Sequence, residues 1–290
     1  MVDVANVVVI ATVAVFLNYL LRRQGRLLET VSGVAEVVQR AVLPDPPTQL
    51  GSLRIAARYA AAHTDARIGG DLYVVQDTPY GVRLIIADVR GKGLKAVAAV
   101  AIMVGAFRVV ADTEADLNEM VSCLEGVLER GLQRRGWEVE RWEGFITAVI
   151  AEIRPDDRTV RLINRGHPSP LLLHESTVQT LGLAEPDLPL GIGSLWECRS
   201  LAETVTVRQG STLLFMTDGV TEARDRSGEF YDPLTRLSGV GFASPDDLVE
   251  TLLRDVNRHT GRRRSRQDDT AVLAVTLDRN THSDEVKADI

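Results

Sequence analysis

The chain has 290 residues, a formal net charge of −7 and an apolar fraction of 45%. This length can bury a large core and favours one domain of roughly two hundred residues with a short attachment. The negative charge without a basic stripe argues against a nucleic-acid partner, because phosphate backbones are bound by clustered Lys and Arg. Cys123 and Cys198 are far apart in the sequence, which predicts buried, reduced thiols rather than a zinc site or a disulfide framework.

The N-terminal segment 4–21 is long and apolar. As a helix it would reach roughly 27 Å, which is close to the thickness of a bilayer core. Arg22, Arg23 and Arg26 follow it, and the positive-inside rule then places the rest of the chain in the cytoplasm. We therefore assign residues 1–24 to a transmembrane or membrane-anchoring helix at the inner (cytoplasmic) membrane. The alternative is a cytoplasmic protein whose terminal helix packs against protein.

Residues 25–50 are predicted to form a linker helix. Apolar residues recur at helical spacing from Leu27 to Val42, and the sequence PDPP ends the pattern. A regular apolar face of this kind suits pairing with a second copy, so the linker predicts a homodimer. At the other end of the chain, residues 279–290 are polar and predict a disordered tail.

Residues 51–278 read as strands joined by turns, with a few long helices. Two pairs of apolar strands flank short turn-rich inserts and predict β-hairpins. Hairpins give antiparallel sheets, and helices between hairpins form layers outside them, which is an α+β architecture. The expected hairpin strands are 71–76 with 82–89 and 145–153 with 158–164; further strands are 211–217 and 270–277; helices are 94–111, 115–134 and 245–259.

Acidic residues stand at the open end of the first hairpin and at the ends of two further strands. In the first hairpin Asp71 and Asp88 are nearly equidistant from the turn, so they should lie opposite each other. Two carboxylates that close are unfavourable unless a proton or a cation lies between them. Asp218 ends one further strand, and Asp268 and Asp269 begin another.

Each acid alone is also explained by ordinary turn chemistry, since Asp is common beside Gly and just outside strands. Together, in a chain without His or Cys clusters, they favour an oxygen-ligand site for Mg²⁺ or Mn²⁺. Glycines beside the acids let main-chain carbonyls approach an ion. A pair of such ions activates water and clamps a phosphoryl group, so the sequence predicts hydrolysis of a phosphate ester.

Seven motifs in order, IGGDLY, ADVRGKG, FITAVIAEI, NRGHPSPLLL, LPLGIG, TDGVTEARD and QDDTAVLAV, resemble a known family. It is the SpoIIE-like branch of the metal-dependent serine/threonine protein phosphatases (PPM, or phosphatase 2C-like). The resemblance covers about residues 55–277. It implies a four-layer αββα sandwich, in which two antiparallel sheets are flanked by helices, with two Mn²⁺ or Mg²⁺ ions at one edge.

The resemblance also implies roles for individual residues. Asp88 would bridge both ions, and Asp71 and the carbonyl of Val89 would bind one of them. Asp218 and Asp268 would bind the other. Asp71 and Asp88 are thus the catalytic candidates.

Other positions are secondary candidates or departures from the family pattern. Asp269 is the second choice of its pair. Lys92 could contact the substrate phosphate. The chain has Val74 where the family commonly has an acid, and Ala87 where a Gly often precedes the bridging acid. The loss of an acid at position 74 predicts weaker metal binding.

Two further features have two explanations each. The run GRRRSR at 261–266 could contact an acidic partner or form a solvated loop. His167 could donate a proton to the leaving serine or hold a turn before Pro168. We favour the solvated loop for residues 261–266 and the turn-holding role for His167.

Members of this branch remove phosphate from a phosphoserine of a small anti-anti-sigma protein of the STAS type, which changes sigma-factor activity. The resemblance therefore implies a metal-dependent phosphoserine phosphatase in a partner-switching pathway. The alternatives are a catalytically weak or inactive binding module of the same fold, and a hydrolase of small phosphate esters. The four retained acids favour the enzyme.

Overall fold

The computed structural model describes residues 46–60, 69–91, 94–133, 145–154, 156, 158–182, 187–192, 201–261 and 269–278. The predicted membrane helix (1–24), the tail (279–290) and nearly all of the linker lie outside these residues, so they remain predictions. The boundary of the linker at residue 50 is too late. Strand β1 (Gln49–Leu50) already pairs with β2 (Leu53–Ala60), because the prolines end the linker pattern before it.

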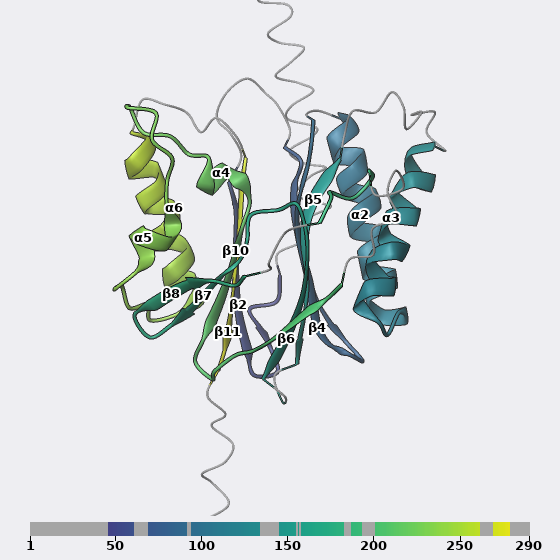
Figure 1. The fold of residues 1–290 in the computed structure, drawn as a ribbon, viewed down its shortest axis with the longest axis horizontal. Coiled ribbons are helices and arrows are strands. Elements are labelled where there is room, and N and C mark those ends of the chain that lie inside the picture. The colour runs from purple at the N-terminus through teal and green to yellow at the C-terminus, as the bar shows by residue number, and fades with distance from the viewer. Residues whose placement is uncertain are drawn as a thin grey trace, which may run out of the picture.

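Two antiparallel sheets pack face to face, as the hairpins predict (Figure 1). The first sheet has the strand order β3-β4-β5-β6-β9, and the second has the order β1-β2-β11-β10-β7-β8. The expected strands did not include the short strands β1, β7, β8 and β9, nor the eight-residue strand β2. The bounds of the strands not yet given are β3 (Asp71–Thr78), β4 (Gly81–Val89), β5 (Ile146–Arg154), β6 (Thr159–Arg165), β7 (Leu171–His174), β8 (Thr177–Thr180), β9 (Glu203–Thr206), β10 (Thr212–Met216) and β11 (Thr270–Leu277).

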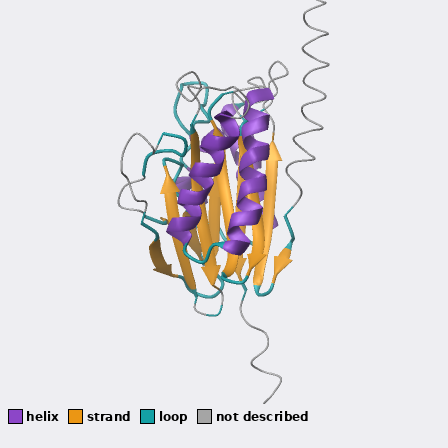
Figure 2. Cartoon of the chain, turned by 90° about the vertical axis from the view of Figure 1, so that its right-hand side faces the viewer, coloured by secondary structure: helices purple, strands orange, loops and turns teal. Residues whose placement is uncertain are grey.

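Helices cover the outer face of each sheet and complete the predicted αββα sandwich. Helices α2 (Leu94–Thr113) and α3 (Leu117–Gln133) lie along the first sheet, as Figure 2 shows. Helices α5 (Pro233–Leu237) and α6 (Pro245–Thr260) cover the second sheet (Figure 1). The single-turn helix α4 (Asp218–Thr221) follows β10.

The central strands, such as β4, β5 and β11, are mostly apolar because both faces of each sheet are buried there. In β4, Leu84 and Ile86 pack in the layer between the sheets. Ile85 and Ala87 pack against the helical layer of α2 and α3. The same alternation decides which way every residue near the strand ends faces.

Helix α2 is long and apolar enough to cross a membrane by composition, yet half of that stretch is buried inside the fold. Ala99, Met103 and Phe107 are fully buried in the core between α2 and the first sheet. This packing agrees with the core helix that the sequence predicts. On α3 the buried stripe includes Leu124, whereas Cys123 is exposed. The expectation of a buried thiol is therefore wrong for Cys123, because that residue lies off the stripe.

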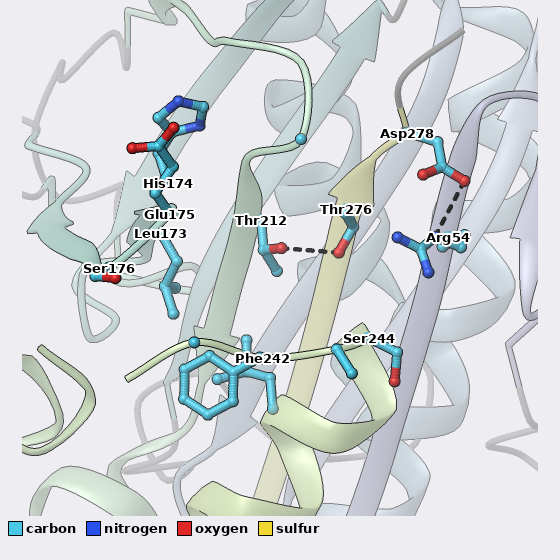
Figure 3. A pocket seen from close by; sticks show the side chains of 14 residues that line it. Arg54, Leu173, His174, Glu175, Ser176, Thr212, Phe242, Ser244, Thr276 and Asp278 are labelled. Carbon is cyan, nitrogen blue, oxygen red and sulfur yellow. Dashed lines mark hydrogen bonds and ion pairs between the residues drawn. The ribbon is translucent and has the colours of Figure 1, made fainter. Parts of the chain in front are cut away.

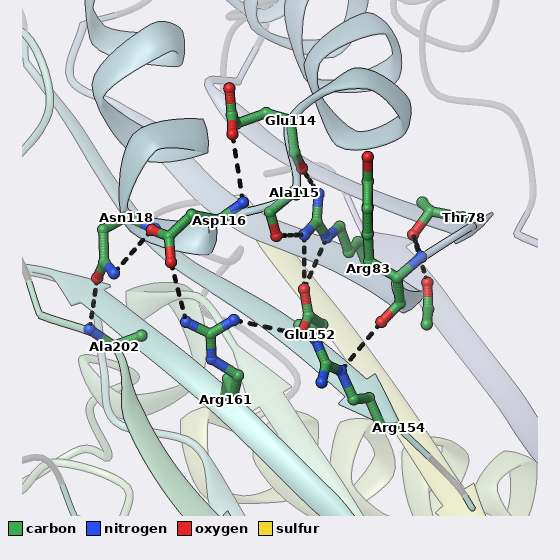
Figure 4. A network of polar contacts seen from close by, with 12 residues as sticks. Thr78, Arg83, Glu114, Ala115, Asp116, Asn118, Glu152, Arg154, Arg161 and Ala202 are labelled. Atoms are coloured by element: carbon green, nitrogen blue, oxygen red, sulfur yellow. Dashed lines mark hydrogen bonds and ion pairs between the residues drawn. The ribbon is translucent and has the colours of Figure 1, made fainter.

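A buried ion pair fastens α2 and α3 to the first sheet (Figure 4). Arg83 and Glu152 are direct neighbours across β4 and β5, and Nη2 of Arg83 is 2.6 Å from Oε2 of Glu152. The same guanidinium donates to the main-chain carbonyls of Ala111, Glu114 and Ala115 at the turn between the helices. The pair lies toward the turn of the β3–β4 hairpin, at the opposite end of β4 from Asp88.

Candidate metal and phosphoester site

Asp71 and Asp88 are directly opposite each other in the β3–β4 hairpin, as the sequence predicts. Tyr73 and Ile86 pack in the layer between the two sheets. Because side chains alternate along a strand, Asp71 and Asp88 face the same layer two positions farther on. The two carboxylates therefore lie at the end of the hairpin where the interior of the sandwich reaches its edge.

Asp71 is buried, with 2% of its surface exposed. Its Oδ2 accepts a hydrogen bond of 2.6 Å from the hydroxyl of Thr217, which itself is fully buried. Burial raises the pKa of the Asp71 carboxyl well above its usual range, and the nearby charge of Asp88 raises it further. The hydrogen bond from Thr217 opposes both effects, because it favours the charged form.

Two more acids act on Asp71 from the second sheet. Asp269 and Asp218 both raise the pKa of Asp71 through their negative charge, so all of these groups share one neighbourhood. Asp269 is 4% exposed and precedes β11, while Asp218 is half-buried at the start of α4. Asp268, the predicted ligand of this pair, lies outside the described residues and remains a prediction.

Glycines allow the acid-bearing segments to approach each other closely. A methyl group at Gly69 would lie 1.8 Å from Oδ2 of Asp269. A methyl group at Gly70 would lie 2.2 Å from the carbonyl oxygen of Val89. A side chain at Gly70 would collide with the main chain, and one at Gly69 would displace the Asp269 carboxylate, so the two glycines let Asp71 lie beside these groups.

The departures from the family pattern do not touch Asp71. Val74 and Ala87 are buried in the core that faces α2 and α3, on the other side of the sheet from Asp71. The expectation that Val74 weakens metal binding therefore finds no contact to support it. Lys92 and residues 262–266 lie outside the described residues, so their roles stay predictions.

His167 is a buried, neutral residue beneath the acids. Its Nδ1 lies 2.9 Å from the hydroxyl of Thr147, the neighbour of Asp88 across β4 and β5. Asn164 holds the main chain of His167 from both sides, at 2.8 and 2.9 Å. Burial lowers the pKa of His167 to about 3, against a smaller opposing effect of the Met216 main chain. These contacts favour the structural role over proton donation.

The donor set fits a hard cation, because carboxylates crowd together beside a main-chain carbonyl. Asp71, Asp88 and Asp218 supply carboxylate oxygens at one edge, and mutual repulsion is the condition that a cation relieves. Within the described part of the chain, no group of three or more acidic, His or Cys side chains is close enough to enclose an ion. The metal-binding roles of Asp71, Asp88, Asp218 and Asp268 therefore remain predictions.

A hollow of about 550 Å³ lies elsewhere, at the opposite end of the second sheet (Figure 3). It is lined by Thr212 and Thr276, whose hydroxyl oxygens are 2.8 Å apart. The Arg54–Asp278 ion pair and Phe242 also line it. Thr212 begins β10, whereas the acids follow the other end of that strand, so the hollow is separate from the candidate metal site.

Sequence reasoning missed two parts of this region. Thr217 was predicted only as part of the motif TDG, with no role of its own. Because side chains alternate along a strand, Thr217 faces the same layer as Phe215, between the two sheets, where it meets Asp71. The Arg83–Glu152 pair was also missed. A charge in each of two apolar strands of one sheet was the signal that could have revealed it.

Known structures share this fold. The SiaA-PP2C domain of Pseudomonas aeruginosa has a TM-score of 0.65 at 16% sequence identity, over 88% of this chain and 99% of that chain. A second structure has a TM-score of 0.61 at 20% identity, over 79% of this chain and 65% of that chain. It contains the PP2C phosphatase domain and a fragment of the regulatory domain of the cell fate determinant SpoIIE from Bacillus subtilis. RsbX in complex with magnesium has a TM-score of 0.55 at 18% identity, over 79% and 97% of the two chains.

The αββα sandwich with acids at one edge is therefore the fold of the PP2C-type phosphatases. Residues 78–278 match the family Stage II sporulation protein E (SpoIIE), which is more than half of the chain. The chain belongs to this family.

Proposed function

We propose that the protein is a metal-dependent phosphoserine phosphatase, and that its substrate is a STAS-type anti-anti-sigma protein. One observation carries the proposal: Asp71 and Asp88 are paired at a sheet edge where two further acids raise the pKa of Asp71. Such crowding of carboxylates disfavours the metal-free ionised state and favours a bound cation. Membership of the SpoIIE family supports the reaction class.

The proposed roles of Asp71 and Asp88 follow from how deeply each carboxylate is buried. Two Mn²⁺ or Mg²⁺ ions, held by Asp71, Asp88, the Val89 carbonyl, Asp218 and Asp268, would activate a water molecule and neutralise phosphoryl charge. Asp71 is buried and fixed by a hydroxyl, so it holds its position without solvent. Asp88 is half-buried, so it can face both the interior and a bound substrate. The magnesium in the RsbX structure supports the choice of a hard cation.

Phosphate release from two substrates tests the proposal. We expect Mn²⁺-dependent release from a phosphorylated STAS protein, with much slower turnover of p-nitrophenyl phosphate. Fast hydrolysis of the small ester alone would support a small-molecule hydrolase. No release from either substrate at saturating Mn²⁺ would contradict an enzyme and leave the binding module. That alternative is favoured by one observation, the lack of a closed ligand group among the described residues.

We also propose that residues 1–24 anchor the protein in the inner membrane and that the linker pairs two copies. Full-length protein should require detergent, while a chain starting at residue 46 should be soluble and keep its metal-dependent activity. The start at 46 preserves β1, which pairs with β2. Full-length protein that stays in the soluble fraction without detergent would contradict the anchor.

Linker pairing has its own test. Polar substitutions at Val31, Val34 and Val38 should weaken association or change turnover, because these residues form the predicted apolar face. Analytical ultracentrifugation of the detergent-solubilised protein measures association. Unchanged sedimentation and unchanged turnover would contradict linker pairing.

A further inference from the structure

A small hairpin, residues 223–231, follows directly after the acid-bearing helix α4. The amide of Tyr231 donates to the carbonyl of Ala223 at 2.8 Å and closes the hairpin. Glu222, just before it, donates its amide to the carbonyl of Asp218 at 2.7 Å. The hairpin therefore begins at the candidate metal site. Figure 1 shows the segment between α4 and α5 at the same end of the sandwich as α4, beside the end of α6.

The tip of the hairpin is fixed by one carboxylate. Oδ1 of Asp225 accepts hydrogen bonds from the Ser227 amide at 2.7 Å, the Ser227 hydroxyl at 2.6 Å and the Glu229 amide at 3.0 Å. The Ser227 hydroxyl and then the Glu229 amide are the main causes that lower the pKa of Asp225 to about 2. The tip thus keeps its shape throughout the physiological pH range.

The base of the hairpin is fastened to α6. The hydroxyl of Tyr231 donates to Oδ2 of Asp255 at 3.0 Å, and the Tyr231 ring packs edge-on against His259. Nε2 of His259 is 3.0 Å from the carbonyl oxygen of Glu229. A hairpin held at both tip and base is pre-organised, so a partner that binds it loses little conformational entropy.

The free face of the hairpin exposes an aromatic ring and an arginine. Phe230 is 48% exposed and is the one aromatic residue among the exposed large apolar residues of the described chain. The Arg224 guanidinium lies 4.0 Å from the centre of the Phe230 ring, and Arg226 is exposed nearby in sequence. Among the described residues, no carboxylate forms an ion pair with Arg224. A stacked guanidinium keeps its N–H edge available for a carboxylate.

We infer that Phe230 and Arg224 dock the protein that carries the phosphoserine, beside the metal site. The inference rests on the proposed function and deepens it. Exposed aromatic and arginine side chains on a rigid support are the composition of interface hot spots. The fitting partner surface presents an apolar side chain next to a carboxylate, which would meet the Phe230 ring and the Arg224 guanidinium. A small phosphate ester presents no such surface, so docking would separate protein substrates from small esters.

The test measures affinity without turnover. Wild-type protein and the variants Phe230→Ala and Arg224→Glu are titrated with a phosphorylated STAS-domain protein in EDTA, by isothermal calorimetry. We expect each variant to bind about tenfold or more weakly, as for a hot-spot residue. Arg208→Glu and Val109→Ala are matched controls, because both residues are exposed and lie outside the hairpin, Arg208 in the loop before β10 and Val109 on α2. Both controls should bind like the wild type.

Activity toward p-nitrophenyl phosphate with Mn²⁺ is measured in parallel. Both hairpin variants should keep this activity within about twofold and keep the wild-type melting temperature, since the proposed contacts of both side chains are with the protein substrate alone. Phosphoprotein affinity within twofold of wild type in both variants would overturn the docking surface, as would a wild type that binds no phosphoprotein. Failure of the proposed function is seen separately, as loss of all metal-dependent turnover in a protein that still binds the phosphoprotein.

Discussion

The hydroxyl of Thr217 donates to Oδ2 of Asp71 at 2.6 Å, across the gap between the two sheets. The hydroxyl oxygen of Thr217 also accepts a hydrogen bond from the amide of Ala271 at 2.9 Å. The Thr217 hydroxyl therefore accepts from the Ala271 amide and donates its own proton to Asp71. One side chain thus joins three segments that carry acids: the start of β3, the end of β10 before Asp218, and the start of β11 after Asp269.

Removal of this hydroxyl should loosen metal binding. Thr217→Val keeps the shape but leaves both Asp71 and the Ala271 amide without their partner. We expect Mn²⁺ affinity to fall at least about tenfold, as for other residues that orient metal ligands. Titration followed by electron paramagnetic resonance of free Mn²⁺ measures the effect directly.

Thr217→Ser is the matched control, because it retains the hydroxyl and loses only a methyl group. It should bind Mn²⁺ close to the wild-type level. Equal weakening in the Ser and Val variants would mean that packing, rather than the hydrogen bond, decides the affinity.

Asp88→Asn tests the predicted bridging role. The substitution keeps the shape and removes the charge proposed to hold both ions. We expect poor Mn²⁺ binding and phosphate release slower by at least about a hundredfold. The metal-free variant should melt at or above the wild-type temperature, since repulsion with Asp71 is relieved. Turnover within a few-fold of wild type at saturating Mn²⁺ would rule out the two-ion mechanism.

The buried Arg83–Glu152 pair should dominate the stability of the far end of the fold. Glu152→Gln leaves the fully buried Arg83 without its charge partner. We expect a loss of about 3–5 kcal/mol in the free energy of unfolding, measured in urea. Arg161→Gln, which removes a partly exposed partner of Glu152, should cost under about 1 kcal/mol. Similar losses in both variants would contradict a special role for the buried pair.

His167 should make the fold sensitive to acid. Its pKa is lowered from 6.5 to about 3, so between these values the unfolded chain binds a proton that the folded chain does not. Stability is therefore present above pH 6.5 and is lost progressively as the pH falls toward 3. His167→Gln should be less stable at pH 7.5 but should lose less stability between pH 6.5 and 4. Urea unfolding at several pH values measures the slope, and an unchanged slope would contradict this account.

Local sequence was enough for the parts of the fold that depend on neighbouring residues. Turn residues between two apolar runs determined the β3–β4 hairpin, and with it the register that places Asp71 opposite Asp88. Helix α6 began where Ser244 caps it, since a serine before a proline and two acids is a strong start signal. The acids predicted to bind metal were identified from motif spacing, which can be followed in the linear sequence, and their role as ligands remains a prediction.

Only the tertiary structure decided what meets across the two sheets. Thr217 and Asp71 are far apart in the sequence, and their contact depends on how one sheet lies over the other. Val74 lies in the core that faces α2, away from Asp71, because that face of β3 is turned toward α2. The sequence of β3 alone does not determine which of its faces meets the helix. The hairpin of residues 223–231 likewise depends on α6 packing beside it. The pattern of a strand shows which residues share each face of the sheet. Which helix or second sheet packs on that face depends on the free energy of burying the apolar surface of the whole sandwich.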